Sequence, residues 1–430
     1  MPTSRTNRSR NGLALIAGAA AATAIATAAP AAAAIPPSIA VSINGAGVVG
    51  NAQSGSASVT PDGRFVAFES YAFNLVPADD NGQRDVFLRD RWGYSVERIS
   101  VNRAGGSANA ESTLGTNAVS ADGRFVVFRS TATDLVPGDA NGEGADIYVR
   151  DRQTRTTSRV SGGAPLTHAE PASISGDGRF VAFVADDSPL VRGDTNGAPD
   201  VFVYDRASAT VRRASVGPRG VQANSLSSAP VLNGNGRFVA FKSFASNLVP
   251  GDPDGAPDVF VRDLRYGLTE KVNYEADGAE FADGVRQGPT ISSDGRMVAF
   301  AAYEGQVYVR DRARRVTVLG SANSAGVPGN EGSHTPLVSP DGRYVTYFSS
   351  ATNLAPPLPS MVPLYRRDLV TGTTRRIPVY TTGGAPLDAA VHPFASSNAG
   401  VVFNTHATNL PFGVRPQPLP YAEQLYLVGW

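Results

Sequence analysis

The chain of 430 residues contains no cysteine, two tryptophans, four histidines and only two lysines, Lys242 and Lys271. The absence of cysteine excludes disulfides, cysteine-ligated metals, thiol catalysis and a lipidated N-terminal cysteine. The folded protein must therefore be held together by its hydrophobic core, for which a chain of this length is ample.

A cluster of positive charge is also absent. The 38 basic residues balance 38 acidic ones, and without Arg5, Arg8 and Arg10 a small acidic excess remains. A nucleic-acid-binding protein usually presents a basic stripe that neutralises a row of phosphates. We therefore expect no nucleic-acid partner.

The N-terminus carries the longest apolar stretch. Arg5, Arg8 and Arg10 precede apolar residues from about Gly12 to Ala29, and small residues up to Ala34 offer several A-x-A cleavage sites. This pattern is typical of a secretory signal peptide. A membrane anchor is the weaker interpretation of this stretch, because it is mostly alanine and only weakly apolar. No later stretch of the chain reaches the ~20 apolar residues that a spanning helix needs.

We predict that residues 1–34 are a signal peptide and that residues 35–430 form one exported domain. The protein is then expected in the periplasm, at the cell surface or in the medium. No transmembrane segment is expected after removal of the signal.

One unit of sequence recurs roughly every 50 to 60 residues. Its first copy is Ser58–Arg91, which contains DGRFVAF and DVFLRDR, and most of it returns at Val119–Arg152. Each copy has a glycine after an acidic or amide residue, at Gly63, Gly123, Gly178, Gly236, Gly295 and Gly342, with a degenerate seventh near Gly400. This periodicity predicts a repeat architecture of seven units.

Each unit has the pattern of four strands. A strand of small residues, such as Gly55–Thr60, precedes the Asp-Gly hairpin signal. The second strand, such as Phe65–Phe68, and the third, such as Asp85–Arg89, are apolar runs, whereas the fourth, such as Ser95–Val101, alternates. Buried central strands with a half-exposed outer strand are typical of a propeller blade. We predict an all-β, seven-bladed β-propeller of four-stranded antiparallel blades.

The two ends of the chain complement each other. Ser38–Ile43 matches a fourth strand, and Gln424–Val428 matches a third strand that has no fourth strand after it. We predict that Ile39–Ile43 pairs beside Gln424–Val428, because this closes the ring and hides the sheet edges.

The motifs S-x-D-G-R-F-V-A-F and D-V-F-V-R-D-R resemble the WD40-like repeats of the TolB-type β-propellers (PD40 repeats). The resemblance covers nearly all of residues 35–430 and implies an exported binding scaffold. That family carries an α/β domain before a six-bladed propeller, whereas the strands here begin by about Ser38 and form seven units. A role in the Tol system is therefore not expected.

The loop between the second and third strands carries an acidic motif in units one to four. Oxygen-bearing residues two apart, a glycine and a further aspartate resemble the first half of a Ca²⁺ loop, although the acid at position twelve is missing. The candidate ligands are Asp79, Asn81, Asp85, Asp139, Asn141, Asp146, Asp194, Asn196, Asp200, Asp252, Asp254 and Asp258.

Two interpretations of this motif are open. Asp and Asn side chains form Asx turns with their own backbone, and the acid that begins the third strand then caps the turn. We favour this local interpretation over a weak calcium site completed by backbone carbonyls. No cofactor is required by any other motif.

The histidines suggest the alternative function. His168, His334 and His392 lie before or within first strands, which line a propeller channel, whereas His406 falls in a second-to-third loop. Imidazoles at the channel mouth would suit a polysaccharide lyase or hydrolase. Their offsets in the repeat differ, and neither an HExxH nor a GxSxG motif occurs. We favour a non-catalytic binding protein.

Strand order assigns the loops to two rims. The short first-to-second and third-to-fourth turns share one rim, whereas the second-to-third loops, such as Tyr71–Arg84, share the other with the inter-blade connections. In units five to seven the acidic motif is replaced by the short Ala302–Gln306 or by the proline-rich Ala355–Pro363 and Pro411–Pro420. Because function concentrates on loops of a rigid scaffold, we expect a monomer that binds a protein or glycan of the cell envelope with the long-loop face.

The arginines of D-G-R and R-D-R, such as Arg64 and Arg152, recur in nearly every unit. Equivalent positions should have equivalent structural roles. We expect turn caps or inter-blade ion pairs.

Overall fold

The computed structural model describes residues 39–139, 144–161, 170, 172–186, 190–252, 255–281, 283–356, 364–377, 391–405 and 423–429. Contacts divide the chain after Ile35, and all described residues lie in the second unit, Pro36–Trp430. The predicted signal peptide lies outside them and stays a prediction. Within the described ranges, no helix is long and apolar enough to cross a membrane.

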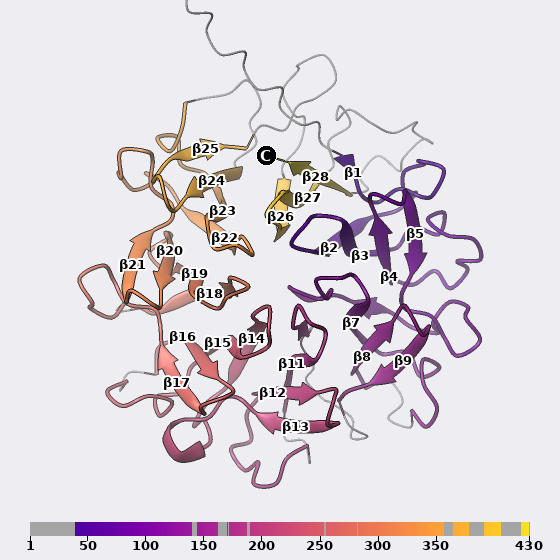
Figure 1. Cartoon of the computed structure of the whole chain (residues 1–430), viewed down its shortest axis with the longest axis horizontal. Coiled ribbons are helices and arrows are strands. Elements are labelled where there is room, and N and C mark those ends of the chain that lie inside the picture. Colours follow the sequence, from indigo (N-terminus) through magenta and orange to yellow (C-terminus); the bar gives the residue numbers. More distant parts are fainter. Residues whose placement is uncertain are drawn as a thin grey trace, which may run out of the picture. The chain divides into compact units, whose positions relative to one another are not determined.

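The second unit contains seven antiparallel four-stranded sheets arranged as the blades of a propeller (Figure 1). Blade 1 is β2 (Ser54–Val59), β3 (Phe65–Ser70), β4 (Asp85–Asp90) and β5 (Ser95–Arg98). Blade 2 is β6 (Ser112–Thr113), β7 (Phe125–Ser130), β8 (Asp146–Asp151) and β9 (Thr156–Arg159). Blade 3 is β10 (Ser173–Ile174), β11 (Phe180–Ala185), β12 (Asp200–Asp205) and β13 (Thr210–Arg213).

Blade 4 is β14 (Ser227–Leu232), β15 (Phe238–Ser243), β16 (Asp258–Asp263) and β17 (Leu268–Lys271). Blade 5 is β18 (Val285–Ile291), β19 (Met297–Ala302), β20 (Val307–Asp311) and β21 (Val316–Leu319). Blade 6 is β22 (Ser333–Val338), β23 (Tyr344–Ser349), β24 (Leu364–Asp368) and β25 (Thr374–Arg376). Blade 7 is β26 (Val391–Ser396), β27 (Gly400–Thr405), β28 (Gln424–Gly429) and β1 (Ile39–Ala40).

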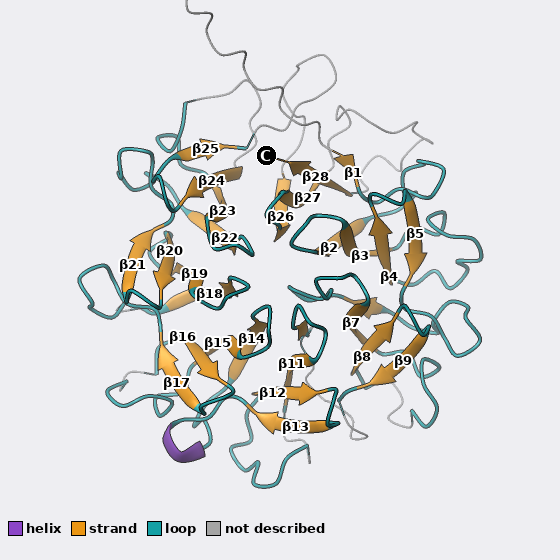
Figure 2. Ribbon diagram, in the orientation of Figure 1, coloured by secondary structure: helices purple, strands orange, loops and turns teal. Residues whose placement is uncertain are grey.

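Strands and loops make up nearly all of the described chain, and its single helix is a one-turn 3₁₀ segment, Pro218–Gly220 (Figure 2). The predicted all-β, seven-bladed architecture is confirmed. First strands such as β2, β14, β18 and β22 lie nearest the centre of the ring, and fourth strands such as β5 and β17 lie outermost (Figure 1).

The ring closes between the two ends of the chain as predicted. β1 pairs antiparallel with β28, and Ile39 lies opposite Leu427. The strand is shorter than the predicted Ile39–Ile43, because the amide of Ile43 bonds back to the carbonyl of Val41 at 2.8 Å and Ile43 bridges to Val49. The fourth strand of blade 1 ends at Arg98 for the same reason, since the amide of Val101 bonds to the carbonyl of Ile99 at 2.9 Å.

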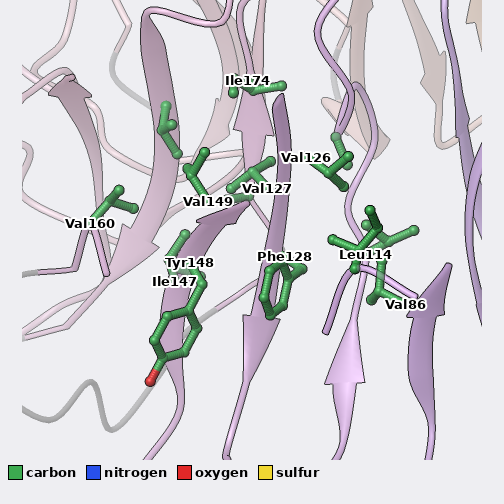
Figure 3. Close-up of a cluster of buried hydrophobic side chains, with 14 of the residues drawn as sticks. Val86, Leu114, Val126, Val127, Phe128, Ile147, Tyr148, Val149, Val160 and Ile174 are labelled. Atoms are coloured by element: carbon green, nitrogen blue, oxygen red, sulfur yellow. The ribbon is translucent and has the colours of Figure 1, made fainter. Parts of the chain in front are cut away.

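The hydrophobic core runs between blades as well as within them. Every residue of β3 is buried, whereas exposure alternates along β5, as the strand patterns predict. Figure 3 shows one cluster in which Val86 and Leu114 approach Val126 and Phe128 of β7. Aliphatic side chains from adjoining blades therefore fill a shared space and couple the blades.

The repeated glycines are needed for this packing. Gly123 has a φ of +70°, in the left-handed region, and a Cβ there would lie 2.2 Å from Cδ2 of Phe65 in the preceding blade. Gly178 stands in the same relation to Phe125, with a φ of +72° and the same 2.2 Å distance. Turn geometry and inter-blade contact both require glycine at Gly123 and Gly178.

The D-G-R arginines form ion pairs inside the blade, not between blades. Arg64 donates from Nε and Nη2 to the two carboxylate oxygens of Asp90, at 3.1 and 2.8 Å. The same pairing joins Arg124 to Asp151, Arg179 to Asp205, Arg237 to Asp263, Arg296 to Asp311 and Arg343 to Asp368. It fastens the first turn of each of blades 1 to 6 to the end of its third strand.

The second R-D-R arginine has the predicted roles of turn cap and inter-blade partner. Arg152 donates to the carbonyl of Gly123 at 2.6 Å and pairs with Glu97 of blade 1 at 2.6 Å. Its guanidinium also lies 5.0 Å from the ring centroid of Phe65. Arg206 of blade 3 and Arg312 of blade 5 cover Phe125 and Phe238 of the preceding blades in the same way, whereas blades 4 and 6 have Leu264 and Leu369 at this position.

We predict that the D-G-R pairs make stability fall in strong acid. The arginine hydrogen bonds lower the pKa values of Asp90, Asp151 and Asp205 from 3.8 to about 2. This stabilisation is complete above the unfolded pKa and is lost as the pH falls through the folded value. The melting temperature should therefore drop between about pH 4 and pH 2. The triple variant Asp90→Asn, Asp151→Asn, Asp205→Asn should melt lower at pH 6 and converge with the wild type at pH 2; parallel curves would contradict the assignment.

Candidate functional site

The acidic loop of blade 1 contains its own cation. Nη1 of Arg98, at the end of β5, lies 3.2 Å from Oδ1 of Asp79 and 4.0 Å from Oδ2 of Asp85. All three side chains are buried. Burial raises the pKa of Asp85 to about 6, although hydrogen bonds from Ser100 and Asn81 oppose the shift.

The same cluster occurs in blades 2 to 4. A cation at the end of each fourth strand contacts both aspartates: Arg159 with Asp139 (3.2 Å) and Asp146 (3.3 Å), Arg213 with Asp194 (3.1 Å) and Asp200 (3.2 Å), and Lys271 with Asp252 (3.3 Å) and Asp258 (2.9 Å). Burial alone would lower the pKa of Lys271, but the carboxylates of Asp258, Asp252 and Glu280 outweigh it and raise that pKa.

Cation and aspartates disappear together in two other blades. In blade 5 the position of Arg98 is Leu319, opposite Tyr308, and the position of Asp85 is Gln306. In blade 7 these positions are Ala40, opposite Tyr426, and Gln424. Blade 6 keeps its arginine, Arg376, which donates instead to the hydroxyl of Tyr365 at 2.6 Å. The basic side chain is therefore the partner of the loop carboxylates.

The loops have the Asx turns of the local interpretation. Oδ1 of Asn81 accepts from the amide of Gln83 at 2.9 Å, and its Nδ2 donates to Asp85 at 2.9 Å. Asn196 makes the same two bonds, to the amide of Ala198 at 3.1 Å and to Asp200 at 3.1 Å. Asn141 and Asp254 lie outside the described residues.

The calcium site stays a prediction. Among the described residues, no group of three or more histidine and acidic side chains is arranged to hold a metal ion. A Ca²⁺ ion between the carboxylates of one of these loops would have to displace a buried guanidinium or ammonium group.

The short-turn end of the channel is lined by aliphatic and small polar side chains and is fastened by hydrogen bonds. A cavity of about 210 Å³ there is lined by aliphatic residues, including Val59, Val119, Ile174, Leu232, Ile291 and Val338, and by Asn117, Asn233, Ser293 and Ser396. Successive turns bond across blade boundaries: the amide of Ala121 to Gly176 O (2.8 Å), Gly234 to Ser293 O (2.9 Å), Ser293 to Pro340 O (2.8 Å) and Asn398 to Pro61 O (2.9 Å).

The opposite end, which we call the long-loop mouth, is chemically varied. The fifth residue of each second strand lies opposite an aliphatic residue near the start of the third strand, as Glu69 lies opposite Val86. This position, which we call the variable row, is Glu69, Arg129, Val184, Lys242, Ala301, Phe348 and Asn404. We did not predict this row from the sequence. The signal that could have revealed it is that the fifth residue of the second strand differs from blade to blade, whereas the fourth residue stays apolar.

Members of the variable row contact the next blade. Oε2 of Glu69 accepts from the amide of Leu114 at 3.1 Å, beside a cavity of about 130 Å³ that Tyr71 also lines. Burial raises the pKa of Glu69, although the bond from Leu114 opposes it. Lys242 donates to the carbonyl of Arg286 at 3.1 Å.

Two of the predicted histidines contact Phe348, a member of the variable row. The ring of Phe348 stacks on His334 of its own blade, with centroids 4.6 Å apart, and on His392 of blade 7, 6.2 Å away. Burial lowers the pKa of His334, and Arg286 and His392 lower it further. His168 and His406 lie outside the described residues.

Comparison with known proteins supports the fold and no closer relationship. No protein-family model matches the chain, and no curated protein matches it. An oligogalacturonate lyase solved in complex with manganese is 13% identical with a TM-score of 0.51, over 91% of this chain and 96% of that one. The chain is thus a seven-bladed β-propeller that shares its fold with proteins of different activities.

Two further solved structures are less similar to this chain in backbone structure. TolB from Acinetobacter baumannii is 20% identical with a TM-score of 0.39, over 62% of this chain, which spans about half (53%) of the TolB chain. The β-propeller domain of the Trilobed protease from Pyrococcus furiosus is 12% identical with a TM-score of 0.49, over 88% of this chain and 95% of that one.

Proposed function

We propose that the protein is an exported, monomeric, non-catalytic scaffold that captures a protein or glycan of the cell envelope or medium at the long-loop mouth. The variable row carries this proposal. One position of the repeat holds an acid, two cations, an aromatic ring, an amide and two aliphatic residues.

A purely structural position would keep one chemistry in every blade. The residue two places earlier does so in six blades, where Ala67 and its counterparts Val127, Ala182, Ala240, Ala299 and Val402 are small or aliphatic and buried. The variable row lies nearer the long loops, and its members range from buried, as Val184 and Ala301 are, to half-buried, as Arg129, Lys242 and Phe348 are. Chemical diversity on a rigid ring is what recognition of an asymmetric ligand requires.

The two ends of the channel also differ in what they offer a ligand. The described lining of the cavity at the short-turn end has aliphatic, amide and hydroxyl side chains but no charged or aromatic one, and the turns there are bonded to one another. The long-loop mouth presents exposed side chains, including Arg286 and His392, beside the half-buried Lys242 and Phe348. A partner with both charged and planar groups therefore fits this mouth better than the short-turn end.

Affinity capture with residues 35–430 as bait, against envelope and medium fractions of the source cells, tests the proposal. Lys242→Glu and Phe348→Ala should each reduce recovery of the captured partner at least about tenfold, since central contacts of this kind dominate binding. Val370→Asp is the control, because Val370 is 78% exposed on the opposite, short-turn rim. Capture lost in the control and kept in the mouth variants would reject the long-loop mouth. The mass of the protein recovered outside the cell reports whether the signal peptide is removed.

The stacked His334 and His392 favour one alternative, a polysaccharide lyase or hydrolase with its site at the same mouth. A screen of acidic and neutral glycans, with and without chelator, separates the two functions. If the wild type turns over a glycan and His392→Ala does not, the scaffold proposal is rejected in favour of the enzyme. Glycan binding without turnover would support the scaffold.

A further inference from the structure

Blade 6 has a cavity that is independent of the long-loop mouth. Its volume is about 320 Å³, and it is lined by Arg343, Tyr344, Arg366, Thr371, Thr373 and Arg375. These residues come from the start of β23, from β24, from β25 and from the turn between the last two. The cavity thus belongs to the short-turn side of the blade.

Among the described residues that line this cavity, positive charge exceeds negative charge. The one carboxylate among them, that of Asp368, accepts from Nε and Nη2 of Arg343, at 3.1 and 2.8 Å. The guanidinium groups of Arg366 and Arg375 add two further charges to the same wall. Burial lowers the pKa of Arg366, and the neighbouring Arg375 and Arg343 lower it further, against Tyr344 and Asp368.

Arg366 occupies a position that is aliphatic in all the other blades. It lies opposite Thr346, whose hydroxyl is buried and has no partner among the described residues. The corresponding pairs elsewhere are Ala67–Leu88, Val127–Val149, Ala182–Val203, Ala240–Val261, Ala299–Val309 and Val402–Leu427. A core position of the repeat has therefore become polar in this blade alone.

Arg366 also lies directly opposite a like charge, Arg375 of β25. Like charges directly opposite in an antiparallel pair are destabilising. The residues opposite the corresponding positions in blades 1 to 5 are Glu97, Ser158, Arg212, Glu270 and Val318, each facing an aliphatic residue. The facing arginines of blade 6 therefore carry a local electrostatic cost.

Tyr344 holds two of the cations in place. The guanidinium of Arg366 lies 4.5 Å from the ring centroid of Tyr344, and that of Arg343 lies 5.0 Å from it. The hydroxyls of Thr371 and Thr373, 2.8 Å apart, provide further donors at the edge of the cavity. Fixed guanidinium forks and nearby hydroxyls are suited to planar or tetrahedral oxyanions.

We propose that this cavity binds an oxyanion group of a small ligand, a carboxylate, sulfate or phosphate, between Arg366 and Arg375. The bound anion separates the two like charges and neutralises them. The proposal does not depend on the function assigned to the long-loop mouth, and failure of either leaves the other unchanged.

Thermal unfolding of residues 35–430 in low-millimolar sulfate, phosphate or glucuronate tests the site. At least one anion should raise the melting temperature by about 2–4 °C, with a midpoint in the titration, because a ligand of the native state stabilises it by mass action. The anion with the largest shift identifies the source of the oxyanion. No shift with any of the three would overturn the proposal.

The variants separate specific binding from a general salt effect. Arg366→Leu restores the residue of blades 1 and 7, so it should raise the melting temperature without anion and abolish the anion-dependent shift. Arg375→Thr should also abolish the shift. Arg212→Thr removes the arginine at the corresponding place in blade 3 and should keep it. Equal shifts in Arg366→Leu and wild type would overturn the site, even if both fold well.

Discussion

Gly178→Ala is expected to destabilise the protein by about 3 kcal/mol or more, from two separate causes. Its φ of +72° is unfavourable for a residue with a Cβ. The new Cβ would also lie 2.2 Å from Cδ2 and 2.9 Å from Cε2 of Phe125. Because the contact is an aromatic ring held between two blades, overpacking adds about 1–3 kcal/mol to the backbone strain.

Gly63→Ala separates these causes. Gly63 has a nearly identical φ of +74°, but its nearest neighbours to a Cβ are Arg91 at 3.3 Å and Ala399 at 3.4 Å. It should therefore show only the backbone strain of about 1–2 kcal/mol. Denaturant unfolding of both variants measures the difference. Equal losses would mean that the ring of Phe125 moves aside and that the glycine is retained for its turn alone.

This glycine illustrates which parts of the fold could be predicted from the sequence. The Asp-Gly or Asn-Gly hairpin and the apolar run after it are local signals that occur in six units. The degenerate unit around Gly400 gave the seventh, so the blades and their number followed directly. The contact of Gly178 with Phe125 joins residues 53 positions apart, and no local pattern specifies it. The ring closure was predictable because Ser38–Ile43 matches a fourth strand and Gln424–Val428 matches a third, whereas the early end of β1 depends on a backbone bond of Ile43.

The candidate site was harder to predict for a similar reason. The acidic loops were evident in the sequence, but their cations stand at the ends of fourth strands, which have alternating polar residues and resemble solvated edges. Arg98 is 19 residues beyond Asp79 and is nonetheless buried against it. The usable signal was that Leu319 and Ala40 replace the cation where the aspartates are missing. The stack of His334, Phe348 and His392 joins two blades, and no regular spacing of these residues in the sequence indicated it.

Arg213→Leu is expected to cost about 3–5 kcal/mol, because it removes the cation from a buried ion cluster and leaves the charges of Asp194 and Asp200 uncompensated. The side chains of these aspartates are 5% and 0% exposed, so water cannot solvate them in place of the guanidinium. Adding Asp194→Asn and Asp200→Gln should restore most of the loss, since blade 5 is built with Leu319 and Gln306 at the equivalent positions. Denaturant unfolding of the single and triple variants measures both effects.

The same variants test the calcium prediction. Without its guanidinium, the loop of blade 3 presents the carboxylates of Asp194 and Asp200 to a cation, and carboxylates are ligands that Ca²⁺ accepts. Millimolar CaCl₂ should therefore raise the melting temperature of Arg213→Leu more than that of the wild type, and the triple variant should lose this response. Magnesium at the same concentration controls for ionic strength. If the wild type responds to calcium as strongly as Arg213→Leu, the ion does not compete with Arg213, and the acidic loops bind calcium in spite of their internal cations.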